Sequence, residues 1–115
     1  MEALGEILGP LLISLEEIPI ADTERIKRLR SILLVHSYIY YRLCTSLISD
    51  DEWQAAADEL TWLQAQGPVS IGFYDEAFKD WDGTTGFHLP QDHWVTGKAH
   101  YLIYLHEKGV GKTTL

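Results

Sequence analysis

Residues 29–68 read LRSILLVHSYIYYRLCTSLISDDEWQAAADELTWLQAQGP, and this stretch decides the fold. Apolar side chains recur at helical spacing on both sides of a short acidic corner, which predicts two α-helices. A corner this short makes the two helices antiparallel neighbours. The sequence therefore predicts a mainly α fold: a small single domain built on an antiparallel helical hairpin over residues 23–67, with a C-terminal helix packed on it.

Local signals predict the limits of the first hairpin helix. Asp22 and Thr23 are suitable N-caps for a helix that starts near Glu24 and stops near Thr45. A helix that is apolar over much of its girth is expected to be central to the fold. Its recurring buried positions are Ile26, Leu29, Leu33, His36, Tyr40 and Leu43.

The second hairpin helix has a stronger start signal. Ser49 and Glu52 form a capping box, and Ile48 is placed to pack onto the first turn. Asp50 in that turn suits the positive end of the helix dipole. The pair Gly67-Pro68 ends the helix. Its predicted buried face consists of Trp53, Ala56, Ala57, Leu60 and Leu63.

The segments outside the hairpin complete one domain of 115 residues. Residues 1–20 are expected to hold a short apolar helix and a linker. Residues 68–109 form a turn-rich segment and a last helix, and residues 110–115 are expected to fray.

The turn-rich segment predicts less regular structure. Residues 73–81 favour a short helix, and a minor two-stranded element between residues 70–74 and 86–89 stays open. Asp92 is the expected N-cap of a last helix that runs through His106. The inward positions expected on this helix are Val95, Ala99, Leu102, Ile103 and His106. The side chains expected to fill the space between it and the hairpin are Trp62, Trp81 and Trp94.

The composition limits the function. The formal net charge is −8, which disfavours direct nucleic-acid binding because phosphates repel an acidic surface. Cys44 is the single cysteine, so an internal disulfide is excluded and a reducing compartment is expected. The apolar stretch LGEILGPLLISL contains Glu6 and Pro10 and is too short to span a bilayer. We expect a cytoplasmic protein without a membrane anchor.

The hairpin contains HSYIYY at residues 36–41, ISDDEWQ at residues 48–54, and the pair Glu59-Leu60. This pattern resembles the N-terminal Ia domain of bacterial NAD-dependent DNA ligases, in which a tyrosine-rich helix precedes Ile-Ser-Asp-x-Glu-Tyr-Asp and a Glu-Leu pair. The match covers residues 29–68 without a gap. In that family the hairpin recognises the nicotinamide mononucleotide portion of NAD.

The resemblance implies a ligand-binding site at Tyr40, Tyr41, Asp50, Trp53 and Gln54. Trp53 replaces the family tyrosine and lacks its hydroxyl, and Gln54 replaces an aspartate and lacks its charge. Aromatic faces and a carboxylate are also what a planar, cationic nicotinamide ring requires. The alternative stays open that Tyr40 and Trp53 are core aromatics and that Asp50 is only a helix-start charge.

The sequence predicts no enzyme and no metal site. DNA ligation requires a Lys-x-Asp-Gly motif in a large adenylation domain. The chain offers Lys79 in KDWDG, with one residue too many before Asp-Gly, and is too short for that domain. The five histidines match no zinc-ligand spacing. The tail GVGKTTL lacks the first glycine of a phosphate-binding loop.

Two functions therefore remain. The first is a non-enzymatic module that binds a nicotinamide nucleotide, NAD or nicotinamide mononucleotide, without a further cofactor. The second follows from the charge pattern, because the stretch from Asp50 to Asp92 is strongly acidic with Lys79 as its single base. In this alternative the chain is a phage-type inhibitor or adaptor that docks onto a basic, nucleic-acid-binding host protein and keeps the hairpin as a scaffold.

Overall fold

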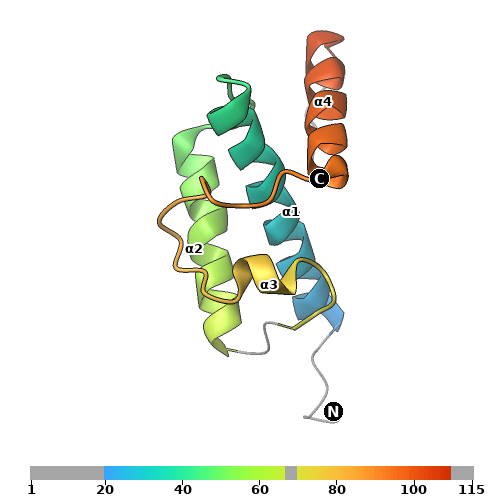
Figure 1. The fold of residues 1–115 in the computed structure, drawn as a ribbon. Helices are drawn as coiled ribbons and strands as arrows, with labels where there is room; N and C mark the ends of the chain where they lie inside the picture. The colour runs from blue at the N-terminus through green and yellow to red at the C-terminus, as the bar shows by residue number, and fades with distance from the viewer. Residues whose placement is uncertain (1–19, 67–69, 110–115) are drawn as a thin grey trace, which may run out of the picture.

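The structure is a computed structural model that describes residues 20–66 and 70–109. Four helices lie in this part of the chain: α1 (Ile20–Arg42), α2 (Asp50–Gln66), α3 (Asp75–Phe78) and α4 (His93–Glu107). Figure 1 shows α1 and α2 running side by side in opposite directions, with α4 on the other side of α1. The predicted mainly α fold, with its hairpin and packed C-terminal helix, is confirmed.

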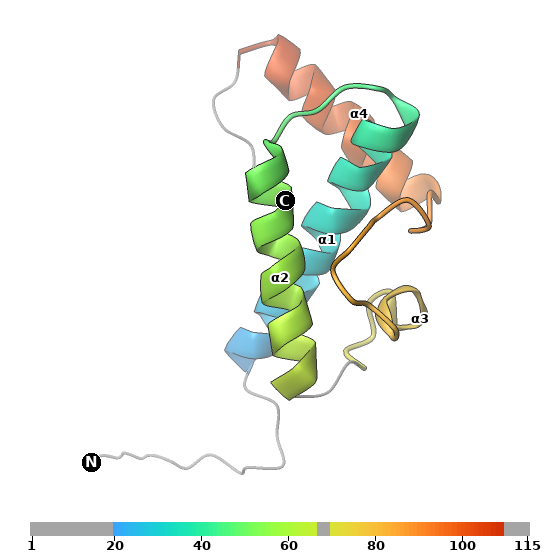
Figure 2. The same ribbon diagram turned by 90° about the vertical axis from the view of Figure 1, so that its left-hand side faces the viewer.

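The two-stranded element does not form in the described residues. Residues 70–74 make a series of bends, and residues 86–89 pass through a turn. Figure 2 shows α3 and the chain that follows it lying against one face of the hairpin. The hydrogen bond from Leu89 N to Gly86 O closes a local turn instead of pairing two strands. The alternating pattern was too short to impose extended pairing.

The hairpin core joins the apolar stripes of α1 and α2. Leu29 and Leu33 of α1 are almost fully buried in one cluster with Ala57 and Leu60 of α2. Phe78 of α3 is fully buried against the same cluster. Burial of a large apolar side chain stabilises the folded state by about 1.5–3 kcal/mol. This cluster therefore fixes the hairpin and the short helix that covers it.

A second cluster attaches α4 to α1. Val35 and Ile39 are fully buried together with Ala99 and Leu102 of α4. The predicted cap at Asp92 is confirmed, since its Oδ1 accepts a hydrogen bond from Val95 N at 3.0 Å. His106 is exposed, and the prediction that it faces inward is wrong. It lies near the end of α4, beyond the last buried residues of the helix.

The tryptophans do not fill the space between the hairpin and α4. Trp62 is 59% exposed and Trp94 is 37% exposed. Trp81 is half-buried, but it packs against Phe78 and Trp53 on the face of the hairpin that carries α3. Aliphatic residues and Ala99 form the contact between α1 and α4 instead, with Tyr38 packed beside them.

The limits of the hairpin helices differ in part from the prediction. α1 begins at Ile20, so Asp22 lies inside its first turn and the proposed caps at Asp22 and Thr23 are wrong. α1 ends at Arg42, before Thr45, because Cys44 adopts a left-handed backbone conformation with φ of 58°.

The predicted capping box at the start of α2 is confirmed. Ser49 N donates to Glu52 Oε1 at 2.9 Å, and Glu52 N donates to Ser49 Oγ at 3.0 Å. The two reciprocal bonds satisfy backbone donors that a helix start leaves without partners. They also fix the orientation of the first turn, in which Asp50 lies.

A buried arginine joins α1 to the rest of the domain. The Arg30 side chain is fully buried, and it donates to Gln64 Oε1 of α2 at 2.7 Å. It also donates to the Phe73 carbonyl at 2.7 Å and to Asp75 Oδ1 at 2.8 Å. The helix expected over residues 73–81 is reduced to α3, which begins at Asp75.

Three predictions fall outside the described residues. They are the apolar helix within residues 1–20, the fraying of residues 110–115, and the helix stop at Gly67-Pro68, although α2 does end at Gln66. No helix in the described part of the chain combines the length and the apolar character needed to cross a bilayer.

Candidate functional site

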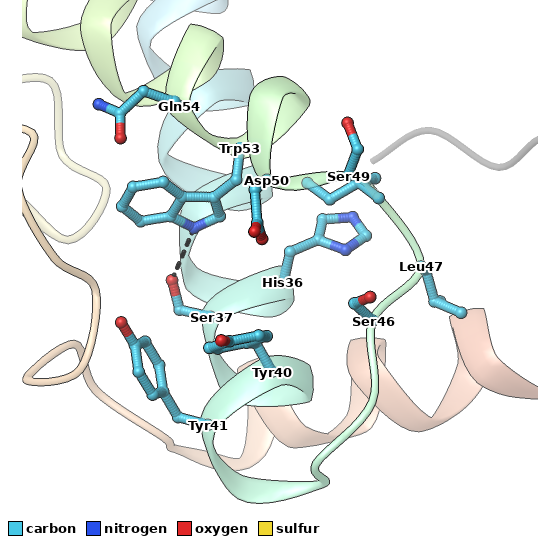
Figure 3. Close-up of a pocket in the computed structure, with 11 residues that line it drawn as sticks. His36, Ser37, Tyr40, Tyr41, Ser46, Leu47, Ser49, Asp50, Trp53 and Gln54 are labelled. Atoms are coloured by element: carbon cyan, nitrogen blue, oxygen red, sulfur yellow. Dashed lines mark hydrogen bonds between the residues drawn. The ribbon is translucent and has the colours of Figure 1, made fainter.

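A hollow of about 230 Å³ lies where the end of α1 meets the start of α2. All five residues predicted from the sequence line it: Tyr40, Tyr41, Asp50, Trp53 and Gln54. Figure 3 shows Trp53 and Asp50 reaching from α2 toward the tyrosines of α1. The remaining lining consists of residues that the sequence analysis did not assign to a site: His36, Ser37, Ser46, Leu47, Ile48 and Ser49.

The local folding of the chain explains this convergence. His36 and Tyr40 lie one turn apart on α1, and Asp50 and Trp53 lie three apart on α2, so each pair shares a helix face. The capping box at Ser49 starts α2 so that its first turn faces the last turns of α1. The loop between the two helices lines a further side of the hollow, which stays open to solvent.

Trp53 forms a fixed wall of the hollow. Its indole Nε1 donates a hydrogen bond to Ser37 Oγ of α1 at 3.1 Å, marked by the dashed line in Figure 3. Its ring also packs edge-on against Trp81, with 6.2 Å between the ring centroids. Since the single polar atom of the indole is already bonded, Trp53 offers the hollow an aromatic surface without a free donor.

The two tyrosines form the opposite side. Tyr41 is held by a contact between its hydroxyl and Thr85 Oγ1 at 3.2 Å and by the Phe87 ring. Tyr40 packs edge-on against Tyr41 with 5.0 Å between centroids, and it remains 53% exposed. Tyr40 is therefore no core aromatic, and its ring face is available to stack on a ligand.

Asp50 gives the hollow its charge. Its side chain is exposed and points from the start of α2 toward His36 and Tyr40 (Figure 3). The same turn of α2 also carries Asp51 and Glu52. No lysine or arginine of the described residues lines the hollow. The site therefore has a negative potential, which attracts cations and disfavours anions.

His36 is the one ionisable residue among the lining residues that the sequence did not assign to the site. It is only 7% exposed, and its Nδ1 has no hydrogen-bond partner. Burial lowers the pKa of His36 from 6.5 to about 4, although the negative charge of Glu52 opposes the shift. At neutral pH the imidazole is therefore uncharged. The signal in the sequence is a histidine within an otherwise apolar helix stripe, a pattern that predicts a core position.

Gln54 lies at the edge of the hollow. Its Nε2 donates to Asp58 Oδ1 at 2.9 Å and to the Gly83 carbonyl at 3.1 Å. The amide therefore ties α2 to the loop that contains Gly83. In Figure 3 the side chain turns away from the tyrosines, so its contribution to the hollow is the outer part of the wall.

The other candidate groups do not assemble a site. Lys79 is exposed and pairs with Glu76 at 2.8 Å, and this hydrogen bond raises the pKa of the lysine. Cys44 is exposed at the end of α1. Within residues 20–66 and 70–109, no three acidic, histidine or cysteine side chains gather closely enough to hold a metal ion.

In comparisons with known proteins, the chain matches no family model, no curated protein and no solved structure. The geometry and the chemistry of the hollow are therefore what connect its residues to a function.

Proposed function

We propose that the chain is a non-enzymatic binding module that takes the nicotinamide ring of a nucleotide into the hollow between α1 and α2. One observation carries the proposal: two aromatic side chains, Tyr40 and Trp53, and the carboxylate of Asp50 border one open hollow. An oxidised nicotinamide ring is planar and cationic. It gains from aromatic faces through quadrupole attraction and from a nearby carboxylate through charge attraction.

The size of the hollow suits part of a dinucleotide. At about 230 Å³ it is smaller than the roughly 300–1,000 Å³ that is usual for sites of drug-sized ligands. A nicotinamide ring with its ribose fits this scale, whereas the adenylate half of NAD would extend into solvent. Nicotinamide mononucleotide is therefore expected to bind about as tightly as NAD.

The hydroxyls of the lining support binding over catalysis. Ser37 accepts a hydrogen bond from Trp53, and Ser49 is engaged in the capping box. A nucleophilic serine needs an adjacent base that accepts its proton. Among the described residues, the buried His36 Nδ1 has no hydrogen-bond partner, so none of the three lining serines is paired with it. We therefore propose no covalent step.

Contacts of acidic side chains within the chain support the acidic-adaptor alternative less well. Several acidic side chains of the stretch from Asp50 to Asp92 are engaged within the chain. Glu59 pairs with Arg25 through two hydrogen bonds, at 2.6 and 2.7 Å, and Asp75 pairs with Arg30. Asp92 accepts from Tyr74 and Val95. These contacts reduce the acidic surface that would remain for a basic partner.

Isothermal titration of the full chain with nicotinamide mononucleotide, and with NAD, tests the proposal. We expect a binding heat in the titration and a higher Tm in thermal denaturation with ligand present. Asp50→Ala combined with Tyr40→Ala should abolish both the binding heat and the rise in Tm. Asp51→Ala is the matched control, because Asp51 lies in the same turn but does not line the hollow. This variant should keep the affinity within about twofold, the scale expected for an exposed charge.

A lack of response to millimolar amounts of both ligands would contradict the proposal. An equal loss in Asp51→Ala and in the double variant would also contradict it, because only general surface charge would then matter. In either case the acidic-adaptor alternative would gain, and its own signature is a partner affinity that falls steeply as salt increases.

A further inference from the structure

The charged side chains at the α2 end of the hollow are all negative. Asp50 lines it, and Asp51 and Glu52 follow in the same turn of α2. His36 also lines the hollow and could carry a positive charge. It is uncharged at neutral pH because burial lowers its pKa to about 4. A nicotinamide nucleotide brings a cationic ring and an anionic phosphate, and the described residues at the hollow complement only the ring.

The positive side chains of the described residues are engaged elsewhere. Arg42 is the nearest to the hollow in sequence, and its guanidinium lies over the Phe87 ring, 4.7 Å from the centroid. Arg25 pairs with Glu59, and Arg30 is buried with Asp75. None of these groups lines the hollow.

The start of α2 does not replace a cation. A helix N-terminus can bind phosphate through its unpaired N–H groups and its dipole. Here one of these donors, Glu52 N, is already bonded to Ser49 Oγ. The three carboxylates of the same turn already complement the dipole and would repel an added phosphate.

We infer that the hollow selects a pyridinium nucleoside, a planar cation with only neutral polar substituents, over the corresponding 5′-phosphate. The inference rests on the proposed function and refines it: the nucleotide binds through the same ring, but more weakly than the nucleoside. The aromatic rings of Tyr40 and Trp53 contact both ligands alike. Asp50 attracts the ring of both, but the phosphate of the nucleotide meets the acidic first turn of α2 without a compensating cation.

Titration calorimetry of the full chain with three probes tests this inference. The probes are nicotinamide riboside, its 5′-phosphate, and reduced nicotinamide riboside, which keeps the same groups but has a neutral ring. At low ionic strength we expect the riboside to bind about tenfold more tightly than its phosphate, a gap that narrows at high salt. The reduced riboside should bind more weakly than the oxidised form, because it lacks the positive charge.

A charge-neutral variant provides the internal check. Asp50→Asn keeps the shape of the side chain and suits a helix start, so the variant should retain Tm within a few degrees. It should weaken the binding of the riboside more than the binding of the phosphate. The difference in affinity between the two ligands should therefore become smaller. Asp51→Asn, which changes the same charge outside the lining, is the control and should change this difference less.

The possible results separate the two claims. Binding of the 5′-phosphate as tightly as the riboside, or more tightly, would overturn this inference and leave the proposed function in place. Equal affinity for the oxidised and the reduced riboside would also overturn it. Failure of all three probes to bind would overturn the proposed function and the inference together.

Discussion

The indole Nε1 of Trp53 donates a hydrogen bond to the hydroxyl of Ser37, at a distance of 3.1 Å. The bond crosses from α2 to α1 beside the hollow, since both residues line it. Ser37 is almost fully buried, so the bond is shielded from water on one side. It orients the tryptophan ring as a wall of the hollow and couples the stability of the hairpin to the shape of the candidate site.

Removal of this bond should weaken the hairpin. Ser37→Ala leaves a half-buried indole N–H without its acceptor, which should lower the free energy of unfolding by about 1–2 kcal/mol. Trp53→Phe alone should cost more, because it also removes packing against Trp81. Urea denaturation of the two single variants and the double variant measures the coupling. The exposed Ser46→Ala is the control, and additive effects of Ser37→Ala and Trp53→Phe would contradict the coupling.

Gly86 must remain a glycine for the same wall to form. A Cβ at this position would overlap the Ser37 hydroxyl and would come within 3.2 Å of Trp53 Cζ2. Gly86→Ala should therefore lower the free energy of unfolding by about 1–3 kcal/mol through overpacking. It should also weaken ligand binding by displacing the indole. Thermal denaturation measures the loss of stability, and titration with the ligand measures the loss of affinity.

Gly97→Ala is the matched control for Gly86→Ala. A Cβ at Gly97 has nothing within 4 Å, and the residue lies inside α4. The substitution should stabilise the domain by up to about 1 kcal/mol, because alanine favours helix more than glycine does. Equal destabilisation at both glycines would show that the close contact at Gly86 is not the cause.

Burial of His36 should make stability depend on pH. Its pKa is about 4 in the folded chain, compared with 6.5 in the unfolded chain. Above pH 6.5, His36 is neutral in both the folded and the unfolded chain, so it does not lower the free energy of unfolding. As pH falls from 6.5 toward 4, only the unfolded state takes up the proton, so the free energy of unfolding should fall by about 3 kcal/mol in total.

Urea denaturation between pH 7 and pH 4 measures this loss. His36→Gln removes the titrating group and should flatten the slope of the free energy of unfolding against pH. The substitution His106→Gln, at an exposed position, should leave this slope unchanged. The groups that face His36 across the hollow are carboxylates, Asp50 from the lining and Glu52 through its charge. An unchanged slope in His36→Gln would show that His36 is not the source of the pH dependence.

Removal of the Arg30 side chain should lower the free energy of unfolding more than removal of any other described cationic side chain. Arg30→Met leaves Asp75 and the Phe73 carbonyl without their buried donor, which should lower the free energy of unfolding by about 3–5 kcal/mol. Arg25→Met breaks an exposed pair with Glu59 and should cost less than about 1 kcal/mol. Chemical denaturation compares the two variants, and similar losses would contradict the structural role of Arg30.

Signals within a few residues of each other were sufficient to predict several elements. The capping box of Ser49 and Glu52 set the start of α2, and Asp92 set the start of α4. The helical spacing of Leu29, Leu33 and Leu60 identified the inner faces of the hairpin. These features depend on helical periodicity and on local hydrogen bonds, which are written in adjacent residues.

The sequence alone determined the antiparallel hairpin and placed Tyr40, Tyr41, Asp50, Trp53 and Gln54 near its corner, because short-range spacing fixes which side chains share a helix face. Only the tertiary structure decided which of these side chains are exposed to the hollow and which are held by hydrogen bonds within the protein. The bonds of Trp53 to Ser37, of Gln54 to Gly83 and of Arg30 to Asp75 join residues 16 to 45 positions apart. Such contacts depend on how whole helices and loops pack, and no local pattern in the chain encodes them.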